Sequence, residues 1–273
     1  MKYNRLISSL IAALFLSACA TSPSGRSQLM LVSPDQAISA SRTAYTEILK
    51  PLDKEGKVDS DPKMVKRVKG ITAKIVYQAT QAFPETRNWA WNIKVIEDAE
   101  TVNAWCMAGG KMAVYTGLIE QLEPTDDELA QVIAHEVSHA LANHTAERMS
   151  VAMASQIGIM AVSVATKDSK YRTAALVGAP LVASLAIQLP NSRTAETEAD
   201  RIGIELAAKA GYNPHAAAKL WQKMGQLDKA SPAEFFSTHP APGNRQKTLA
   251  ALAPQMMKYY NPKQTAPSYT FKN

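Results

Sequence analysis

The run His135-Glu136-Val137-Ser138-His139 constrains this chain most strongly, because it places two histidines four residues apart with a glutamate beside the first. On an α-helix, residues four apart share one face and lie about 6 Å apart along the axis. The two imidazoles can therefore bind one metal ion, while the adjacent carboxylate can take a proton from a water at that metal. The pattern predicts a helix-borne zinc site built for hydrolysis.

Two other interpretations compete with this one. The same spacing occurs on ordinary amphipathic helices, where the histidines are only a surface pair. A closed structural zinc site is disfavoured, because such sites use four ligands, often cysteines, and the chain has only Cys19 and Cys106. A catalytic site needs three protein ligands and one open position. A third ligand elsewhere in the chain therefore decides between the interpretations.

Two acidic residues further along the chain are the candidates for that ligand. Glu196 and Asp200 are four residues apart in a second expected helix, which begins near Ser192 and ends near Ala210, so they share a face. We expect Glu196 to be the third zinc ligand and Asp200 to accept the free ring N–H of a ligand histidine. An acidic pair at this spacing is commonly just a solvated face, but the upstream histidines favour the metal site.

A histidine third ligand is the alternative to Glu196. The pattern H-E-x-x-H-x-x-G-x-x-H needs a glycine at position 142 and a histidine at position 145, whereas Ala142 and Thr145 stand there. His144 is one residue early, and on a continuous helix it would face away from the metal. We therefore expect His144 to make a polar contact near the end of the helix.

Four segments of the sequence match a known pattern when they are taken together and in order. They are residues 103–105 with 109–118, the helix around 135–139, residues 193–203, and residues 237–240 with Arg245. Through these segments the chain resembles the gluzincin family of zinc metallopeptidases that includes the CAAX prenyl endopeptidases, the HtpX heat-shock proteases and the mitochondrial Oma proteases. Within that family it is most similar to the soluble periplasmic lipoprotein members.

The resemblance implies a zinc endopeptidase with one Zn²⁺ per chain. The family's zinc ligands match His135, His139 and Glu196, and its general base matches Glu136. The carboxylate that supports a ligand histidine matches Asp200. The resemblance therefore assigns the same roles as the helical spacing does.

The resemblance also implies roles that the spacing does not reveal. His239 matches a family histidine near the metal, which either stabilises the transition state or occupies the open position in a latent form. Arg193 and Arg245 match partners of these groups. The family's edge strand pairs with the substrate backbone, and it corresponds to a stretch that contains Asn103, Ala104 and Trp105.

Local patterns and the resemblance together predict an α+β fold, mainly α, of the gluzincin type, with a small antiparallel or mixed sheet and a helical bundle that carries the metal site. Capping residues and prolines mark helix starts, and Thr125 with Glu128 forms a capping box before the metal helix. The expected elements are helices over residues 34–49, 62–82, 126–148 and 192–210, and strands over residues 91–97, 104–107 and 111–115.

Two apolar segments, residues 151–165 and 174–189, raise the question of membrane insertion. The first is near the lower limit for spanning a bilayer, and the second is interrupted by Gly-Ala-Pro at 178–180. Some family members carry transmembrane helices here, so a hairpin in lipid is the alternative. We expect two buried helices packed over the catalytic core. The apolar helical face over residues 214–227, which includes Trp221, is also expected to be core.

The first residues carry a targeting signal. Lys2 and Arg5 precede an apolar stretch over residues 6–16 that suits a secretory signal and is too short for a permanent transmembrane helix. It ends Leu-Ser-Ala before Cys19, which resembles a bacterial lipobox, so we expect lipidation at Cys19. No aspartate follows, which favours the periplasmic face of the outer membrane. The expected organisation is a signal peptide over residues 1–18, a lipidated tether over 19–32 and a single metallopeptidase domain over 33–273.

Charge and cysteine usage limit the remaining partners. The formal net charge is a modest +6, and no basic run is interleaved with aromatic residues, so we expect no nucleic-acid partner. If Cys19 is lipidated, Cys106 has no intrachain partner. We expect Cys106 to be a small packing side chain in preference to a redox-sensitive thiol.

These patterns predict a zinc metalloendopeptidase that hydrolyses unfolded or misfolded envelope proteins, is held at the membrane by its lipid anchor, and has envelope assembly machinery as a further partner. Recognition by an edge strand depends on backbone hydrogen bonds, so unfoldedness matters more than sequence. The main alternative is a chaperone or assembly factor for outer-membrane proteins, with His239 holding the protease site latent. A third hypothesis is an exopeptidase that trims short peptides.

Overall fold

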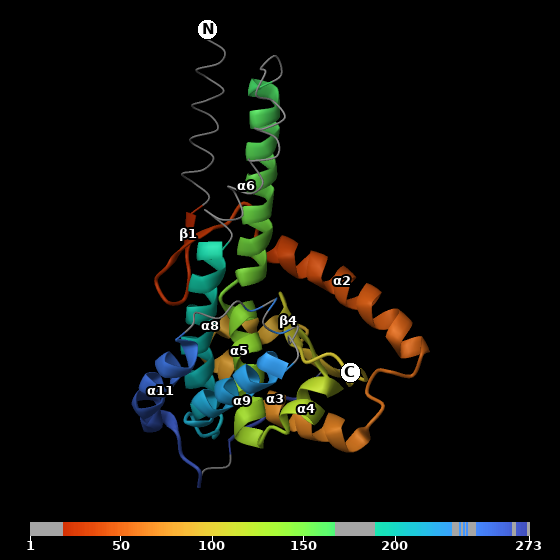
Figure 1. The fold of residues 1–273 in the computed structure, drawn as a ribbon, viewed down its shortest axis with the longest axis vertical. Helices are drawn as coiled ribbons and strands as arrows, with labels where there is room; N and C mark the ends of the chain where they lie inside the picture. Colours follow the sequence, from red (N-terminus) through yellow and green to blue (C-terminus); the bar gives the residue numbers. More distant parts are fainter. Residues whose placement is uncertain are drawn as a thin grey trace. The chain divides into compact units, whose positions relative to one another are not determined.

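The computed structural model describes residues 19–166, 189–230, 235, 237, 239, 244–263 and 266–271 (Figure 1). The chain divides into two compact units, Met1–Ala37 with Asn143–Asn191, and Ile38–Ala142 with Ser192–Asn273. The sequence predicts one domain over residues 33–273. The unit boundaries fall inside that range, since residues 143–191 belong to the first unit and the stretches on either side of them belong to the second.

The second unit holds a three-stranded mixed sheet, as the sequence predicts. Strand β3 (Asn92–Ile96) runs parallel to β5 (Lys111–Tyr115), and β4 (Ala104–Met107) pairs antiparallel with β5, which gives the order β3-β5-β4. The predicted hairpin of β4 and β5 is thereby confirmed. Its turn requires a glycine at Gly110, where φ is +80° and a Cβ would overlap the ring of Trp91.

Helix α5 (Asp126–Leu141) is the central element of this unit. Its start is fixed by the predicted capping box, in which Thr125 Oγ1 accepts the N–H of Glu128 and the Glu128 carboxylate accepts the N–H of Thr125. From Glu128 onward every residue of α5 is buried, because α3 (Pro62–Ala82), β4 and α9 (Ala216–Ala230) all pack against it. The metal pattern therefore lies on a helix without a solvent-facing side.

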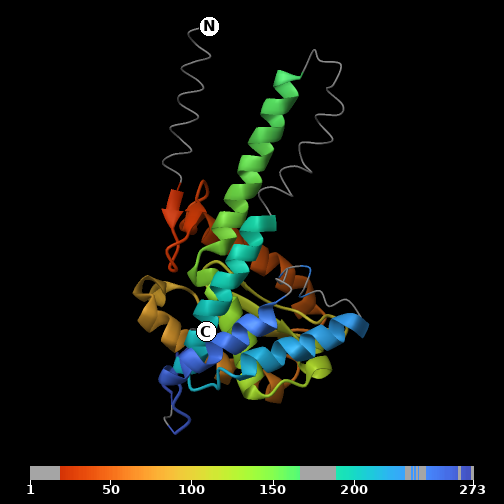
Figure 2. The same cartoon turned by 60° about the vertical axis from the view of Figure 1, so that its left-hand side comes forward.

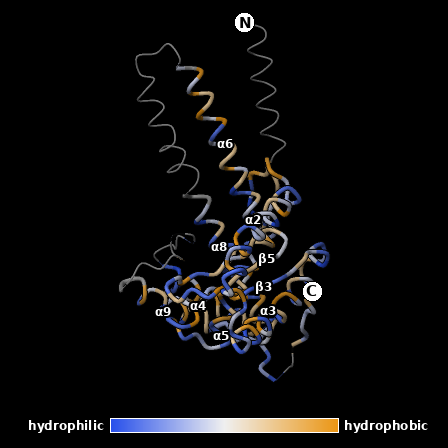
Figure 3. Tube along the Cα trace, turned by 90° about the vertical axis from the view of Figure 1, so that its right-hand side faces the viewer, coloured by the Kyte–Doolittle hydropathy of each residue, from blue (hydrophilic) through white to orange (hydrophobic). Residues whose placement is uncertain are grey.

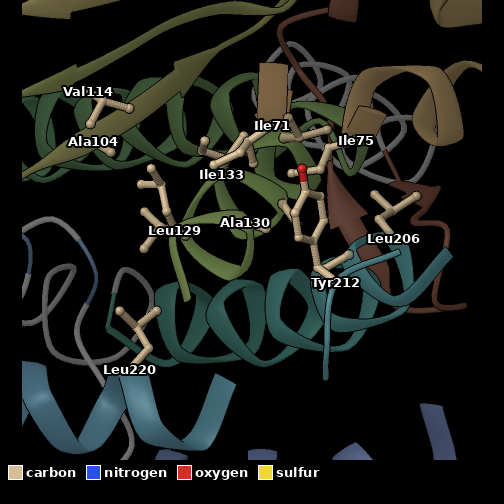
Figure 4. Packing of buried hydrophobic residues seen from close by; sticks show 14 of the residues in the cluster. Ile71, Ile75, Ala104, Val114, Leu129, Ala130, Ile133, Leu206, Tyr212 and Leu220 are labelled. Atoms are coloured by element: carbon tan, nitrogen blue, oxygen red, sulfur yellow. The ribbon is translucent and has the colours of Figure 1, made fainter. Parts of the chain in front are cut away.

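The hydrophobic core surrounds α5, and its members on this helix run from Leu129 to Leu141. Figure 4 shows part of this cluster. Burying one large aliphatic side chain stabilises a fold by about 1.5–3 kcal/mol, so this cluster holds α5 firmly in place. Its members come from α5, α3, the sheet and the C-terminal helices, and they include Leu129, Ala130, Ile133, Ile71, Ile75, Ala104, Val114, Leu206, Tyr212 and Leu220.

The metal helix ends earlier than the sequence predicts. We expected it to continue to about residue 148, but it ends at Leu141, and Asn143 adopts the left-handed conformation with φ +55°. Asparagine tolerates this conformation better than most residues, so α5 stops and α6 (His144–Ala165) begins. The facing expected for His144 assumed a continuous helix, and that assumption is wrong. His144 is buried as the first residue of α6.

Helices α2 (Pro34–Lys54), α3 and α8 (Leu189–Lys209) begin within three residues of their predicted starts at 34, 62 and 192. Helices α9 and α11 (Arg245–Met256) pack side by side in the second unit (Figure 2). The described helices also include α4 (Thr116–Leu122) and 3-10 turns at η1 (Pro84–Asn88) and η3 (Met257–Tyr259).

The first unit contains a strand pair tied to α6. Strands β1 (Cys19–Thr21) and β2 (Ser27–Leu29) are antiparallel. Arg26 donates two hydrogen bonds of 2.6 Å to the buried carboxylate of Glu147 on α6, and Gln28 donates a third of 2.9 Å. Part of the segment over 19–32 that the sequence predicts as a tether is therefore ordered against a helix.

Helix α6 is not the buried helix that we expected over residues 151–165. Met160 and Val164 are 68% and 77% exposed, and Figure 3 shows hydrophobic residues along the helix. The hydrogen bonds described between residues 26–32 and α6 lie in the first two turns of the helix, at Glu147 and Ser150. Among the described helices, none is long and apolar enough to cross a membrane. The second apolar segment, over 174–189, lies outside the described residues except at its end.

The contact between α8 and the metal helix depends on Gly203. A Cβ at this position would lie 3.0 Å from the backbone nitrogen of His135 and 3.1 Å from its Cα. We predict that Gly203→Ala lowers the free energy of unfolding by about 1–3 kcal/mol, because backbone atoms must move apart. Urea denaturation measures this. Gly70→Ala in α3 is the control, since a Cβ there meets nothing within 4 Å and should stabilise the helix by up to about 1 kcal/mol. Equal stabilisation in both variants would contradict the prediction.

Candidate metal centre

His135 and His139 lie one turn apart on α5 and converge on one point. Both side chains are buried, and their Nε2 atoms are 3.0 Å apart. The two rings are nearly perpendicular, at 83°. The alternative of a surface histidine pair is therefore wrong. Imidazole nitrogens so close together and away from solvent have the arrangement of ligands around one ion.

Helix α8 brings Glu196 to the same point. Its Oε2 lies 3.2 Å from Nε2 of His135, and its Oε1 lies 3.3 Å from Nε2 of His139. Tetrahedral zinc with bonds of about 2.0–2.2 Å separates neighbouring ligand atoms by about 3.3 Å. The two nitrogens and the carboxylate therefore fit zinc in both chemistry and spacing.

Asp200 and Arg245 support these donor residues through hydrogen bonds. Oδ1 of Asp200 lies 3.0 Å from Nδ1 of His135, so a metal on Nε2 leaves the Nδ1 hydrogen to be donated to Asp200. Arg245 donates to both oxygens of Asp200 at 2.6 Å and to Oε2 of Glu196 at 3.0 Å. This bidentate pair fixes the orientation of both carboxylates.

Of the two arginines named from the resemblance, only Arg245 reaches this cluster through the contacts described above. Arg193 is exposed on α8, on the same side of the helix as the exposed Thr197. Glu196 and Asp200 lie on the buried side of α8. The structure therefore brings together the acidic pair and Arg245, and leaves Arg193 on the surface.

His239 and Glu136 complete the surroundings of the three donors. Nδ1 of His239 lies 3.4 Å from Nε2 of His135 and 3.2 Å from Oε1 of Glu196, while its Nε2 lies 3.4 Å from Oε1 of Glu136. One donor atom from each of four residues lies within 4.8 Å of all the others, and these residues are His135, His139, Glu196 and His239. His239 is thus positioned where a fourth zinc ligand would be.

The electrostatics of the cluster favour a bound cation. Burial acts to raise the pKa of Glu196, but three imidazoles including His135 outweigh it, so the pKa lies well below the usual value. Burial also acts to raise the pKa of Asp200, and Arg245 reverses this to lower it. For His135, burial and Arg245 act to lower the pKa, yet the two carboxylates raise it to about 9. Both carboxylates are therefore anionic and attract positive charge.

The expected substrate strand β4 lies at the edge of the sheet beside the metal helix. Ala104 and Trp105 line a narrow space together with Glu136 and Ile133 of α5. Asn103 is buried, and its Oδ1 accepts the N–H of Ala104 at 2.8 Å. Cys106 on the same strand is buried, and burial raises its pKa well above the usual value. A thiol held neutral in this way behaves as a packing group.

Two aromatic residues next to the cluster were not recognised from the sequence as site residues. Trp221 lies under the guanidinium of Arg245, with 3.7 Å between Cζ and the ring centroid. Phe235 stacks on His239, with 4.4 Å between ring centroids. Trp221 was expected to be core because its apolar neighbours recur at helical spacing, a pattern that does not distinguish core packing from contact with a buried charge.

The geometry predicts that zinc binding depends on Glu196. We expect Glu196→Ala to weaken zinc binding by more than about 100-fold, because only two protein ligands of the open site remain. Elemental analysis of dialysed protein measures the zinc content, which should fall from one per chain to near zero. Glu205→Ala on the same helix is the control, since Glu205 pairs with Lys209 away from the cluster. Equal zinc content in both variants would refute the assignment.

Comparisons with known proteins agree with this site. The family model described as "Peptidase family M48" matches residues 62–253 of this chain. The chain is 30% identical over 243 residues to Metalloendopeptidase OMA1, mitochondrial, of Bos taurus, covering 86% of this chain and 46% of the relative. It is 28% identical over 178 residues to the Beta-barrel assembly-enhancing protease of Yersinia pestis, covering 63% and 36%. It is 33% identical over 150 residues to Metalloprotease LoiP of Escherichia coli strain K12, covering 54% and 57%.

The chain spans about half the length, or less, of these curated relatives. The family match, in contrast, covers more than half of this chain and contains both histidines of the metal helix as well as Glu196. The expected resemblance, the mainly helical α+β fold, the metallopeptidase class and the zinc cofactor are confirmed. With its donors assembled on α5 and α8, this chain belongs to peptidase family M48.

Proposed function

We propose that this chain is a zinc-dependent endopeptidase that hydrolyses peptide bonds of unfolded or misfolded envelope proteins. The observation that supports this most is the convergence of His135, His139 and Glu196, with 3.0–3.3 Å between donor atoms, next to Glu136. The family match supports the reaction class. The substrate class rests on the predicted address of the chain and on the edge strand.

The chain's own residues divide the chemistry between them. Zinc, when bound, supplies a Lewis acid that polarises the scissile carbonyl and makes a water more acidic. The Glu136 carboxylate accepts the proton of the attacking water and returns it to the leaving amine. Asp200 holds the Nδ1 hydrogen of His135 and thereby directs Nε2 toward the metal. Arg245 keeps the carboxylates of Asp200 and Glu196 in place.

His239 has one of two roles in this scheme. Its Nδ1 lies among the donor atoms, and a fourth protein ligand would close the position that a hydrolytic zinc site leaves open. This position supports a latent form from which His239 withdraws when substrate binds. Alternatively, His239 moves slightly and donates a hydrogen bond to the oxyanion of the transition state. Both roles start from the position of His239 among the donor atoms.

Substrate recognition is proposed to use the edge of β4 that pairs with no other strand among the described residues. Asn103 pairs with Tyr115 of β5 by a 3.1 Å hydrogen bond, and antiparallel pairs alternate along a ladder. The main-chain groups of Ala104 and Cys106 therefore point away from β5, toward an added strand. The N–H of Ala104 is already bonded to Asn103, which leaves the Ala104 carbonyl and the Cys106 amide groups for an extended peptide. Folded proteins rarely offer such a segment.

A chaperone or assembly factor that binds outer-membrane proteins and seldom cuts is the second candidate. It is favoured by the position of His239 among the donors and by the name of the Yersinia pestis relative, a β-barrel assembly-enhancing protease. Envelope assembly machinery would then be a partner. This candidate uses the same edge strand and the same metal site, so the two functions differ only in whether peptide bonds are broken.

Cleavage of an unfolded protein separates the candidates. We predict that the zinc-loaded chain cleaves casein and that Glu136→Gln lowers the rate by about 10²–10⁴-fold, because the general base is lost, while zinc content stays at one per chain. Gel analysis gives the rate, and mass spectrometry of the products distinguishes internal cuts from the single residues that an exopeptidase releases. Binding without cleavage by either version would support the chaperone.

The same assay with His239→Ala decides between the roles of that residue. A latent form predicts faster cleavage in the variant, whereas transition-state stabilisation predicts slower cleavage with unchanged substrate binding.

We propose that the chain is held by lipid at Cys19 on the periplasmic face of the outer membrane. Cys19 is exposed at the start of β1, and the apolar stretch before it supports processing as a lipoprotein signal peptide. The strand pair β1–β2 and its bonds to Glu147 would then connect the anchor to α6.

We predict that Cys19→Ser moves the protein from the membrane fraction to the soluble fraction of bacterial cells, because acyl chains supply the membrane affinity. Immunoblots of the separated fractions measure the distribution. Cys106→Ala, which removes the chain's other cysteine from a buried position, is the control and should leave the distribution unchanged. Membrane retention of the Cys19→Ser protein would exclude a lipid anchor at this residue.

A further inference from the structure

The indole of Trp221 covers the flat face of the buried Arg245 guanidinium. The guanidinium carbon lies 3.7 Å from the ring centroid. Trp221 on α9 is 9% exposed, and Arg245 at the start of α11 is 4% exposed, so the contact is away from solvent. A cation over a tryptophan face is attracted by the negative π-electrons, and this attraction is stronger where water is excluded.

Arg245 needs a fixed plane to do its work at the metal centre. Its Nε and Nη2 donate to Asp200 and its Nη1 donates to Glu196. These three bonds leave from the edge of one planar group, so a rotation of the guanidinium misdirects them together. The edge bonds do not restrain the flat face. The Trp221 ring packs against the guanidinium and supplies that restraint.

The same indole also contacts the residue that stacks on His239. Ring centroids of Trp221 and Phe235 are 5.9 Å apart, and those of Phe235 and His239 are 4.4 Å apart with an interplanar angle of 21°. One ring therefore packs against the group that holds Glu196 and Asp200, and against the aromatic support of His239.

We infer that Trp221 is a positioning residue of the metal centre. Its indole fixes the plane of Arg245, and Arg245 in turn holds Glu196 and Asp200 in the geometry that zinc requires. The inference rests on the proposed function, because it concerns the same site. It assigns to Trp221 a role that a large apolar side chain could not fill, since leucine or methionine would occupy the space without offering a π-face to the cation.

Zinc affinity measured by competition with a chelating dye tests the inference. We expect Trp221→Leu to weaken zinc binding by about tenfold, the lower end of the effect of losing a group that supports a ligand. Trp221→Phe keeps an aromatic face and should stay within about threefold of the natural chain. The visible absorption of Co²⁺-loaded protein gives a second readout, and Trp221→Leu should change it because the ligand geometry changes. Trp221→Met provides another variant without a ring if leucine prevents folding.

Leu220→Ala is the control for a merely structural role. Leu220 is the neighbouring residue on α9 and is 3% exposed, so its truncation lowers stability without removing the ring under Arg245. Thermal unfolding of every variant should show a loss for Leu220→Ala, while its zinc affinity and Co²⁺ spectrum remain those of the natural chain. The inference is overturned if Trp221→Leu or Trp221→Met binds zinc as tightly as the natural chain, if Trp221→Phe weakens binding as much as the ring-free variants, or if Leu220→Ala weakens it equally. Casein cleavage by the natural chain tests the proposed function separately.

Discussion

The burial of two carboxylates beside two imidazoles is the constraint on which the rest of this structure depends. Glu196 and Asp200 are 2% and 7% exposed, and an ionised carboxylate away from water is stable only with charged or hydrogen-bonding partners. Arg245 provides such a partner for both. The arginine is separated from the acidic pair by more than forty residues, so the C-terminal helices must pack correctly before the metal site exists.

Close helix packing turns that electrostatic arrangement into a defined geometry. Helix α8 can approach α5 because Gly203 has no side chain where it meets the backbone of His135. Core residues of α3 and the sheet pack against α5, and they include Ile71 and Val114. Because α5 is buried along nearly its whole length, its histidines have little freedom to rotate. The ligands are therefore positioned by packing before any metal binds, which reduces the entropy lost on binding.

Helical periodicity accounts for what could be predicted from the sequence. Residues four apart share a face, so the convergence of His135 with His139 and of Glu196 with Asp200 followed from spacing alone. Three features do not follow from this periodicity. They are the end of α5 at Leu141, where Asn143 turns the chain, the exposure of α6 beyond its contact with β2, and the place of Trp221 under a buried charge.

Charge balance links the structural role of Arg245 to the proposed chemistry. Glu196, Asp200 and Arg245 together carry one negative charge, so a divalent zinc ion leaves one positive charge in a buried region. That charge is offset by the carboxylate of Glu136, which is itself 4% exposed and would be costly to bury alone as an anion. With a neutral residue in place of Arg245, the charges of Glu196 and Asp200 would balance zinc fully. No excess positive charge would then remain to stabilise the Glu136 carboxylate. The arginine that holds the ligands therefore also favours an ionised base beside them.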